Sequence, residues 1–186
     1  MAFVKLPTVV APLALGLLVT LTGLRSANAQ NLIKNPTAHP HYSVELEPHL
    51  ALDDAFGNDA FGVGMQAAIP IVDPGFVSTI NNSVAIGFGL DWMTARRYCA
   101  GPYCYRSNHI LLPVVMQWNF WFTPNWSAFG EPGLTFHIDD DNSPYNDTFY
   151  IHPAFEVGGR YNFNDKVALT LRVGVPVFTF GASFFL

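Results

Sequence analysis

From residue 42 to the C-terminus, apolar residues alternate with small or polar residues at nearly every second position. A strand places successive side chains on opposite faces of a sheet, so a period of two predicts strands with one apolar and one polar face. In residues 110–122, every second residue is large and apolar, whereas Gln117 and Asn119 point the other way. This pattern excludes a helical bundle and a coiled coil, which need a helical period.

Eight strands of about ten residues follow from this pattern. They cover residues 44–52, 61–69, 84–92, 109–122, 126–138, 151–163, 167–174 and 177–186. Strands of this length cross a membrane when tilted, and an even number of antiparallel strands closes a barrel. The sequence therefore predicts an all-β fold, an eight-stranded antiparallel up-and-down transmembrane β-barrel over residues 42–186. Pro48 is unfavourable in the first strand, because proline donates no hydrogen bond to a sheet.

Most predicted connections fit such a barrel, which has short periplasmic turns and longer outer loops. Residues 123–125 and 164–166 form short connections, whereas residues 94–107 and 139–148 form longer, polar ones. Two connections depart from the rule. Residues 70–82 are long for a periplasmic turn, and residues 175–176 are short for an outer loop.

The composition indicates which face meets lipid. Charged residues make up only 12% of the chain, against roughly 25% in soluble domains. The polar face is rich in Gly, Ala, Thr, Asn and Gln, which suit a narrow, filled lumen, so apolar residues are expected outside. An interfacial aromatic girdle is expected from Trp118, Phe120, Phe122, Trp126, Tyr161 and Phe163. The alternatives are a soluble secreted ligand-binding barrel and an aromatic core cluster.

Residues 1–29 have the form of an export signal. Lys5 precedes an apolar run at residues 9–24, and Ala27-Asn28-Ala29 matches the small-x-small pattern of signal peptidase sites. We expect cleavage after Ala29, followed by an N-terminal lead at residues 30–41; the alternative is a retained membrane anchor. Export to an oxidising compartment favours a disulfide between Cys99 and Cys104 over a metal site on the two thiols.

Six charged residues fall on the face assigned to the lumen: Glu45, Glu47, Glu131, Glu156, Arg160 and Arg172. Unpaired charges are costly in a narrow, poorly hydrated interior, so the two arginines are expected to pair with some of the glutamates. The alternative is that water at the barrel mouth solvates the charges separately. Gly62, Gly64, Gly87 and Gly89 are expected to thin one wall of the lumen, which leaves space for larger side chains.

Four histidines, His49, His109, His137 and His152, fall on inward positions near the outer strand ends. Strand pairing is expected to set His109 opposite Asp139 and His137 roughly opposite His152. Imidazoles on neighbouring strands could converge on a transition metal, with Asp139 or Asp91 completing the shell. The favoured alternative is that the histidines are polar filler, hydrogen-bonded to carboxylates, so no metal or other cofactor is assigned.

The C-terminal residues Phe178, Phe180, Ala182, Phe184 and Leu186 occupy alternate positions. With the export signal and the eight amphipathic strands, they make the chain resemble the small outer-membrane β-barrels of the OmpA, OmpX and OmpW kind. The resemblance implies an integral protein of the Gram-negative outer membrane, with periplasmic termini, surrounding outer-membrane lipid, and the barrel-assembly machinery as a partner during biogenesis. In such proteins the last strand usually ends in an aromatic residue, whereas this chain ends Phe185-Leu186.

Motifs for catalysis and nucleic-acid binding are scarce. The net charge is −5 and the basic residues cluster no further than Arg96-Arg97, which argues against nucleic acid as a partner. Ser107 or Ser127 could serve a lipid-modifying enzyme, but neither has a persuasive spacing to a histidine. We expect a non-enzymatic barrel with a filled lumen, which serves envelope structure or surface interaction through outer loops of unknown partner. The alternative is an outer-membrane lipid A acylhydrolase or acyltransferase.

Overall fold

The computed structural model describes residues 31–53, 60–94, 98–100, 103–105, 107–141 and 147–186. The predicted export signal lies outside the described residues. In this part of the chain the strands are β1 (Glu45–Asp53), β2 (Ala60–Val72), β3 (Asn82–Thr94), β4 (Tyr98–Ala100), β5 (Tyr103–Tyr105), β6 (Ser107–Trp121), β7 (Trp126–Asp141), β8 (Asp147–Asn164), β9 (Val167–Val175) and β10 (Phe178–Phe185). No helix found there is long and apolar enough to span a membrane.

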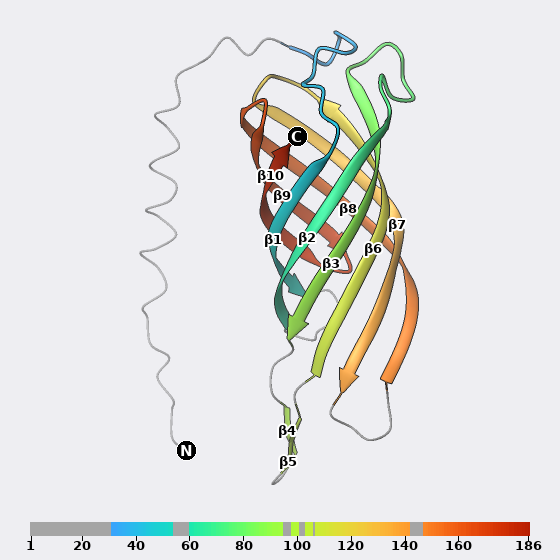
Figure 1. Cartoon of the computed structure of the whole chain (residues 1–186), viewed down its shortest axis with the longest axis vertical. Helices are drawn as coiled ribbons and strands as arrows, with labels where there is room; N and C mark the ends of the chain where they lie inside the picture. The colour runs from blue at the N-terminus through green and yellow to red at the C-terminus, as the bar shows by residue number, and fades with distance from the viewer. Residues whose placement is uncertain (1–30, 54–59, 95–97, 101–102, 106, 142–146) are drawn as a thin grey trace, which may run out of the picture.

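Eight of these strands form a closed barrel in which each strand is antiparallel to the next along the chain (Figure 1). The predicted all-β fold of eight antiparallel up-and-down barrel strands is therefore confirmed. The barrel closes between its first and last strands, where β1 pairs with β10 from Glu45 opposite Phe185 to Leu52 opposite Phe178. The C-terminal residue extends this seam, since the Leu186 amide donates to the Val44 carbonyl at 2.9 Å.

The structure differs from the predicted strands in three details. β6, β7 and β8 have 15, 16 and 18 residues, so they extend beyond the predicted ranges 109–122, 126–138 and 151–163. The predicted polar loop at 94–107 contains the hairpin β4–β5, whose three-residue strands are too short to show a period of two. Pro48 is accommodated because the ladder between β1 and β10 pairs Leu46 and His49 but skips the two residues between them.

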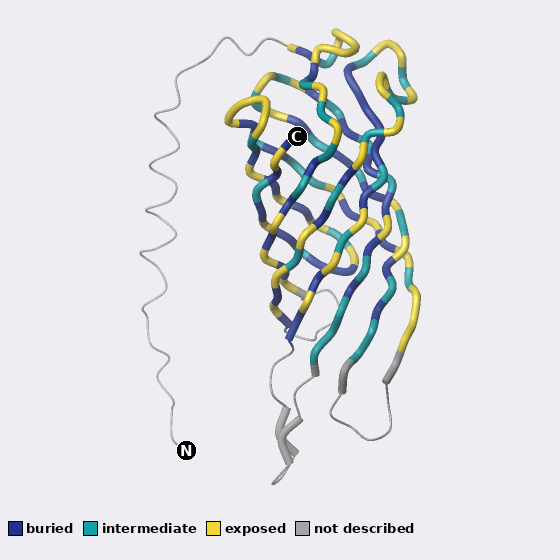
Figure 2. The backbone as a smooth tube through the Cα atoms, in the orientation of Figure 1, coloured by how far each residue is buried: buried dark blue, intermediate teal, exposed yellow. Residues whose placement is uncertain are grey.

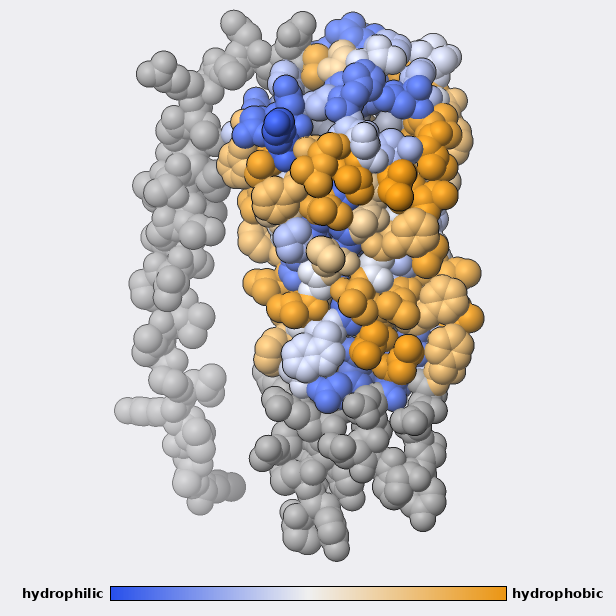
Figure 3. Space-filling view, viewed as in Figure 1, coloured by the Kyte–Doolittle hydropathy of each residue, from blue (hydrophilic) through white to orange (hydrophobic). Residues whose placement is uncertain are grey.

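Buried and more exposed residues alternate along the barrel strands (Figure 2). Since successive side chains of a strand point to opposite faces, the buried ones face the lumen. The outer face carries a belt of exposed apolar side chains (Figure 3). It includes Leu50, Phe61, Trp92, Phe155 and Val157, each more than half exposed. A soluble barrel would bury this surface, so the apolar-out arrangement predicted from the sequence is confirmed and the soluble alternative is disfavoured.

Aromatic rings of the predicted girdle pack in pairs on the outside. Ring centroids lie 4.9 Å apart for Trp118 and Phe120, and 5.1 Å apart for Trp126 and Tyr161. Phe163 packs edge-on against Tyr161 at 5.3 Å and is 60% exposed. This arrangement fits interfacial rings better than the alternative of an aromatic core cluster.

The two ends of the barrel differ. At one, the turn end, lie the C-terminus, the short connections around residues 122–125 and 165–166, and residues 73–81 between β2 and β3 (Figure 1). The N-terminal lead packs there too, because the Leu32 amide donates to the Phe122 carbonyl and the Asn81 amide donates to the Ile33 carbonyl, both at 2.8 Å. Residues 73–81, which are long for a periplasmic turn, thus cover this end of the barrel together with the N-terminal lead. We call the opposite end the loop end.

Candidate functional site

A guanidinium inside the lumen joins strands from opposite parts of the wall. Arg172 on β9 donates to both carboxylate oxygens of Glu47 on β1, at 2.8 and 2.9 Å. Its Nε donates to Glu131 on β7 at 2.5 Å and lies 3.8 Å from a Glu156 carboxylate oxygen. All four side chains are at most 5% exposed. The three carboxylates therefore share one buried guanidinium.

Arg160 on β8 makes a second ion pair, nearer the turn end. Its guanidinium donates to Glu45 at 2.8 Å and to the Asn119 side-chain oxygen at 2.7 Å. Amides link the two arginine centres: Asn119 donates to Gln117 at 3.2 Å, and Gln117 donates to Glu131 at 2.8 Å. The structure thus brings all six charges assigned to the lumen into one connected polar network.

Phe129 lies between the two arginines, and the sequence analysis did not place it. The Arg160 guanidinium carbon is 4.1 Å from the centre of its ring, and that of Arg172 is 5.1 Å away. Both distances allow cation–π attraction. Phe129 shares the parity of Ser127 and Glu131 on β7, so strict use of the period of two would have placed it in the lumen.

Gly64 leaves room for a further buried pair. His49 Nε2 and Asp91 Oδ1 are 2.6 Å apart, and both side chains are at most 3% exposed. A Cβ added at Gly64 would overlap the Asp91 carboxylate and the His49 ring. The expectation that glycine thins this wall is therefore met here, because the pair occupies the space that a side chain would need.

Histidines also gather at the loop end. His109 lies opposite Asp139 in the ladder between β6 and β7, as predicted. The Asp139 Oδ1 atom lies 2.5 Å from His109 Nδ1 and 2.7 Å from His137 Nε2. The expected pairing of His137 with His152 is off by two residues, since His137 pairs with Tyr150. The register depends on how the connection closes, which the polar pattern does not encode. The rings of His137 and His152 remain near each other, with centroids 5.9 Å apart.

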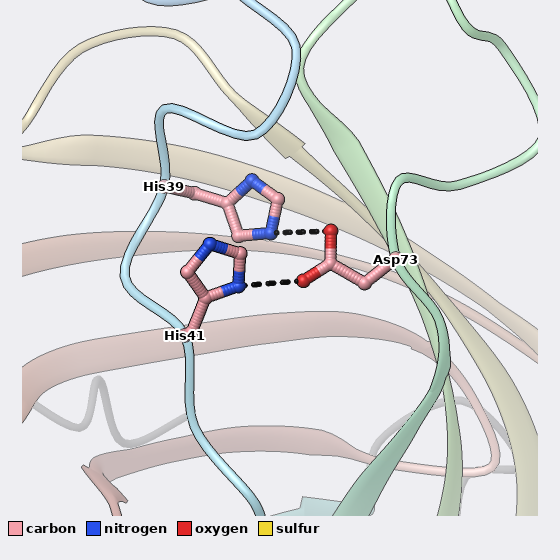
Figure 4. Close-up of side chains that lie close together, drawn as sticks. All are labelled: His39, His41 and Asp73. Carbon is pink, nitrogen blue, oxygen red and sulfur yellow. Dashed lines mark hydrogen bonds and ion pairs between the residues drawn. The ribbon is translucent and has the colours of Figure 1, made fainter.

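A second histidine cluster, which the sequence analysis did not predict, lies at the turn end. His39 and His41 of the lead face the two carboxylate oxygens of Asp73, directly after β2 (Figure 4). The distances are 3.3 Å from His39 Nε2 to Oδ1 and 2.8 Å from His41 Nδ1 to Oδ2. The other nitrogen of His39 is 2.5 Å from the Asn81 side-chain oxygen, and its ring stacks on Trp121. Asp73 is 32 residues from His41, so only tertiary structure brings them together.

Tyr42 fills the space beside this end of the lumen. Its ring packs against Phe185 with centroids 4.9 Å apart. Burial raises the pKa of the Tyr42 hydroxyl, and the Glu45 carboxylate raises it further, because a phenolate there would be poorly hydrated and repelled. Tyr42 therefore contributes a neutral side chain at the end of the barrel.

Open space is distributed unevenly between the two regions. A lumen cavity beside Arg172 and Glu156 has a volume of about 10 Å³, room for about one water molecule. A half-open cavity of about 360 Å³ lies at the turn end, lined in part by His39, Trp121 and Asp165. Of these two cavities, the one at the turn end has room for a ligand.

The remaining predicted residues are only partly described. The backbone sets Cys99 opposite Cys104 in the hairpin β4–β5. Their side chains lie outside the described part of the structure, as does that of Ser107, so the disulfide stays a prediction. The Ser127 hydroxyl is buried and has no hydrogen-bond partner among the described residues.

The sequence matches no protein-family model and no curated protein. Solved structures do match. A de novo designed transmembrane β-barrel aligns with 80% of this chain and 99% of its own, at a TM-score of 0.50 and 12% identity. The Yersinia pestis outer membrane protein Ail, in a phospholipid bilayer nanodisc, aligns with 78% of this chain and 100% of its own, also at 0.50 and 12%. This chain therefore has the fold of a small eight-stranded transmembrane β-barrel, as its sequence resemblance implied.

Proposed function

We propose that this protein is a non-enzymatic integral barrel of the outer membrane, with a lumen closed by its own side chains and loops that engage a partner outside the cell. The observation that carries the proposal is the pair of ion contacts from Arg172 to Glu47 and Glu131, which tie β1 and β7 together across the interior.

The outer surface supports membrane insertion. Phe61 and Phe155 are 60% and 62% exposed, and apolar side chains cover the middle of the barrel face seen in Figure 3. Each buried square ångström of apolar surface stabilises by roughly 25 cal/mol, so a belt of this kind strongly favours lipid over water. Outer-membrane lipid is the partner that this surface requires.

The interior supports a structural role over transport. Eight strands enclose just enough space for side chains, and the cavity beside Arg172 holds about 10 Å³. A hydrated ion needs a continuous water path, and the contacts of Arg172 with Glu47 and Glu131 cross the described interior. We therefore infer that the barrel does not conduct.

The two ends support an orientation. In small membrane barrels the short turns face the periplasm and the longer loops face outward. By this rule both termini are periplasmic, and the connection containing Arg96, Arg97 and the hairpin β4–β5 lies outside. Arg and Tyr, which this connection holds in number, are common anchors of recognition surfaces. The barrel-assembly machinery would act on the chain during insertion.

Bilayer recordings test the closed lumen. The refolded protein in planar bilayers should show no stepwise conductance, while an open porin under the same conditions gives regular steps. Heat-modifiable gel migration confirms that the barrel is folded. Steady, reproducible conductance of the folded wild type would contradict a plugged lumen.

Two cellular measurements test location and chemistry. The protein should sediment with outer membranes, and external protease should cut within residues 94–107 but leave residues 73–81 intact. Mass spectra of lipid A from cells with and without the gene should be the same. A change in the number of acyl chains would instead establish a lipid A acylhydrolase or acyltransferase.

A further inference from the structure

The turn-end cluster brings four donor atoms to one place: a ring nitrogen from His39, another from His41, and both carboxylate oxygens of Asp73 (Figure 4). One donor atom from each residue lies within 4.8 Å of the other two. Imidazole nitrogens with a carboxylate are ligands that Zn²⁺ and similar cations use. We propose that this cluster binds a divalent transition-metal ion of the Zn²⁺ type, a role independent of the proposed function of the barrel.

The contacts of His39 suit a metal ligand. His39 Nδ1 lies 2.5 Å from the Asn81 side-chain oxygen, and a proton on Nδ1 makes this contact a hydrogen bond. In that tautomer the lone pair of Nε2 faces the Asp73 oxygen 3.3 Å away, and a metal ion between the two atoms would be bound by both. A proton on Nε2 that is donated to Asp73 is the competing solution.

The His39 ring is held in place before any ion binds. Its side chain is 1% exposed, and the ring stacks on Trp121 with centroids 5.4 Å apart and planes 9° apart. The contact with Asn81 fixes the other edge of the ring. Metal-binding histidines commonly have such an outer partner, which sets the tautomer and the orientation. The site therefore loses little conformational freedom on binding.

An ion can reach the site and complete its coordination there. The His41 side chain is 65% exposed and that of Asp73 is 28% exposed, so the ion arrives from solvent. Water from the same side can serve as a further ligand, as in zinc sites that keep an open position. Because the two histidines belong to the lead and Asp73 follows β2, a bound ion would pin the lead across the turn end.

The loop-end cluster is a weaker candidate. Both His109 Nδ1 and His137 Nε2 lie near the same Asp139 oxygen, at 2.5 and 2.7 Å. Each imidazole can donate its own proton to that oxygen, so the arrangement is satisfied without an ion. This cluster has the same residue types and therefore serves as the matched control.

Calorimetric titration of Zn²⁺ into the refolded protein in detergent micelles tests the proposal. We expect saturable binding of one ion at the turn end. His41→Ala should abolish it, and this exposed change leaves the barrel wall untouched. Asn81→Ala should weaken it by about 10- to 100-fold, the usual effect of losing an outer partner. The control variant His109→Ala with His137→Ala should bind as the wild type does.

Limited proteolysis gives a readout that does not depend on heat. Zn²⁺ should protect the lead from cleavage in the wild type and in the loop-end control, but not in His41→Ala. The proposal is overturned by the absence of saturable binding, by binding that survives His41→Ala, or by binding that disappears in the loop-end control. Heat-modifiable migration of every variant shows that each is folded.

Discussion

The lumen network and the turn-end cluster use charged residues under opposite conditions. In the lumen, Glu47 and Glu131 contact the permanent cation Arg172, and all three side chains are at most 2% exposed. At the turn end, Asp73 faces two imidazoles, and His41 is 65% exposed. A buried charge without its partner is costly, whereas an exposed one can exchange its proton or its ligand. The charged residues of the lumen therefore stabilise the barrel, because water is excluded there. The exposed residues of the turn-end cluster can bind a ligand from solvent.

Removing the Arg172 cation should cause the largest loss of unfolding free energy. Arg172→Leu leaves Glu47 and Glu131 buried without a cation, and loss of one partner from a buried pair costs about 3–5 kcal/mol. Urea unfolding in lipid vesicles, followed by tryptophan fluorescence, measures the change in free energy of unfolding. Neutralising the acids as well, with Glu47→Gln and Glu131→Gln, should recover part of the loss. An unchanged unfolding midpoint for Arg172→Leu would show that the network is not a structural element.

A smaller loss of unfolding free energy is expected from a substitution at Gly64, where the lumen wall is thin. Gly64→Ala places a methyl group against the paired His49 and Asp91, and overpacking of this kind costs about 1–3 kcal/mol. Gly130→Ala is the matched control, because a Cβ at Gly130 meets no atom within 4 Å. Equal unfolding free energies for the two variants would argue against tight packing around the His49 pair.

Without metal, a substitution in the turn-end cluster should hardly change the free energy of unfolding. His41→Ala should change the free energy of unfolding by about 0.5 kcal/mol or less, as surface substitutions usually do. The same urea titration, run with a chelator present, measures it. A loss as large as that of Arg172→Leu would erase the distinction between the two regions.

Substitutions in the hairpin β4–β5 should change the stability of the barrel least. It pairs only with itself in the described structure, so Cys99→Ala with Cys104→Ala should leave the urea midpoint unchanged. In the wild type, non-reduced protein should show no thiol that reacts with a labelling reagent. Labelled Cys99 or Cys104 would exclude the disulfide.

Much of the fold could be predicted because the alternation is a local property. The inward position of Glu45, Arg160 and Arg172 follows from parity alone, and so does the outward position of Phe155. Pro48 and the long connection at 73–81 contradicted simple rules for barrels. The structure resolves both, by a gap in the ladder between β1 and β10 and by the cover that the connection forms with the lead.

The sequence by itself determined which side of the wall each strand residue occupies, since successive side chains of a strand point to opposite faces whatever the strand pairs with. Only the tertiary structure decided which residues meet. The offset of His137 from His152 depends on register, and the meeting of His39 with Asp73 depends on the docking of a lead that has no periodic pattern. Contacts between distant segments arise from closure and packing of the whole chain, and a local pattern holds no information about them.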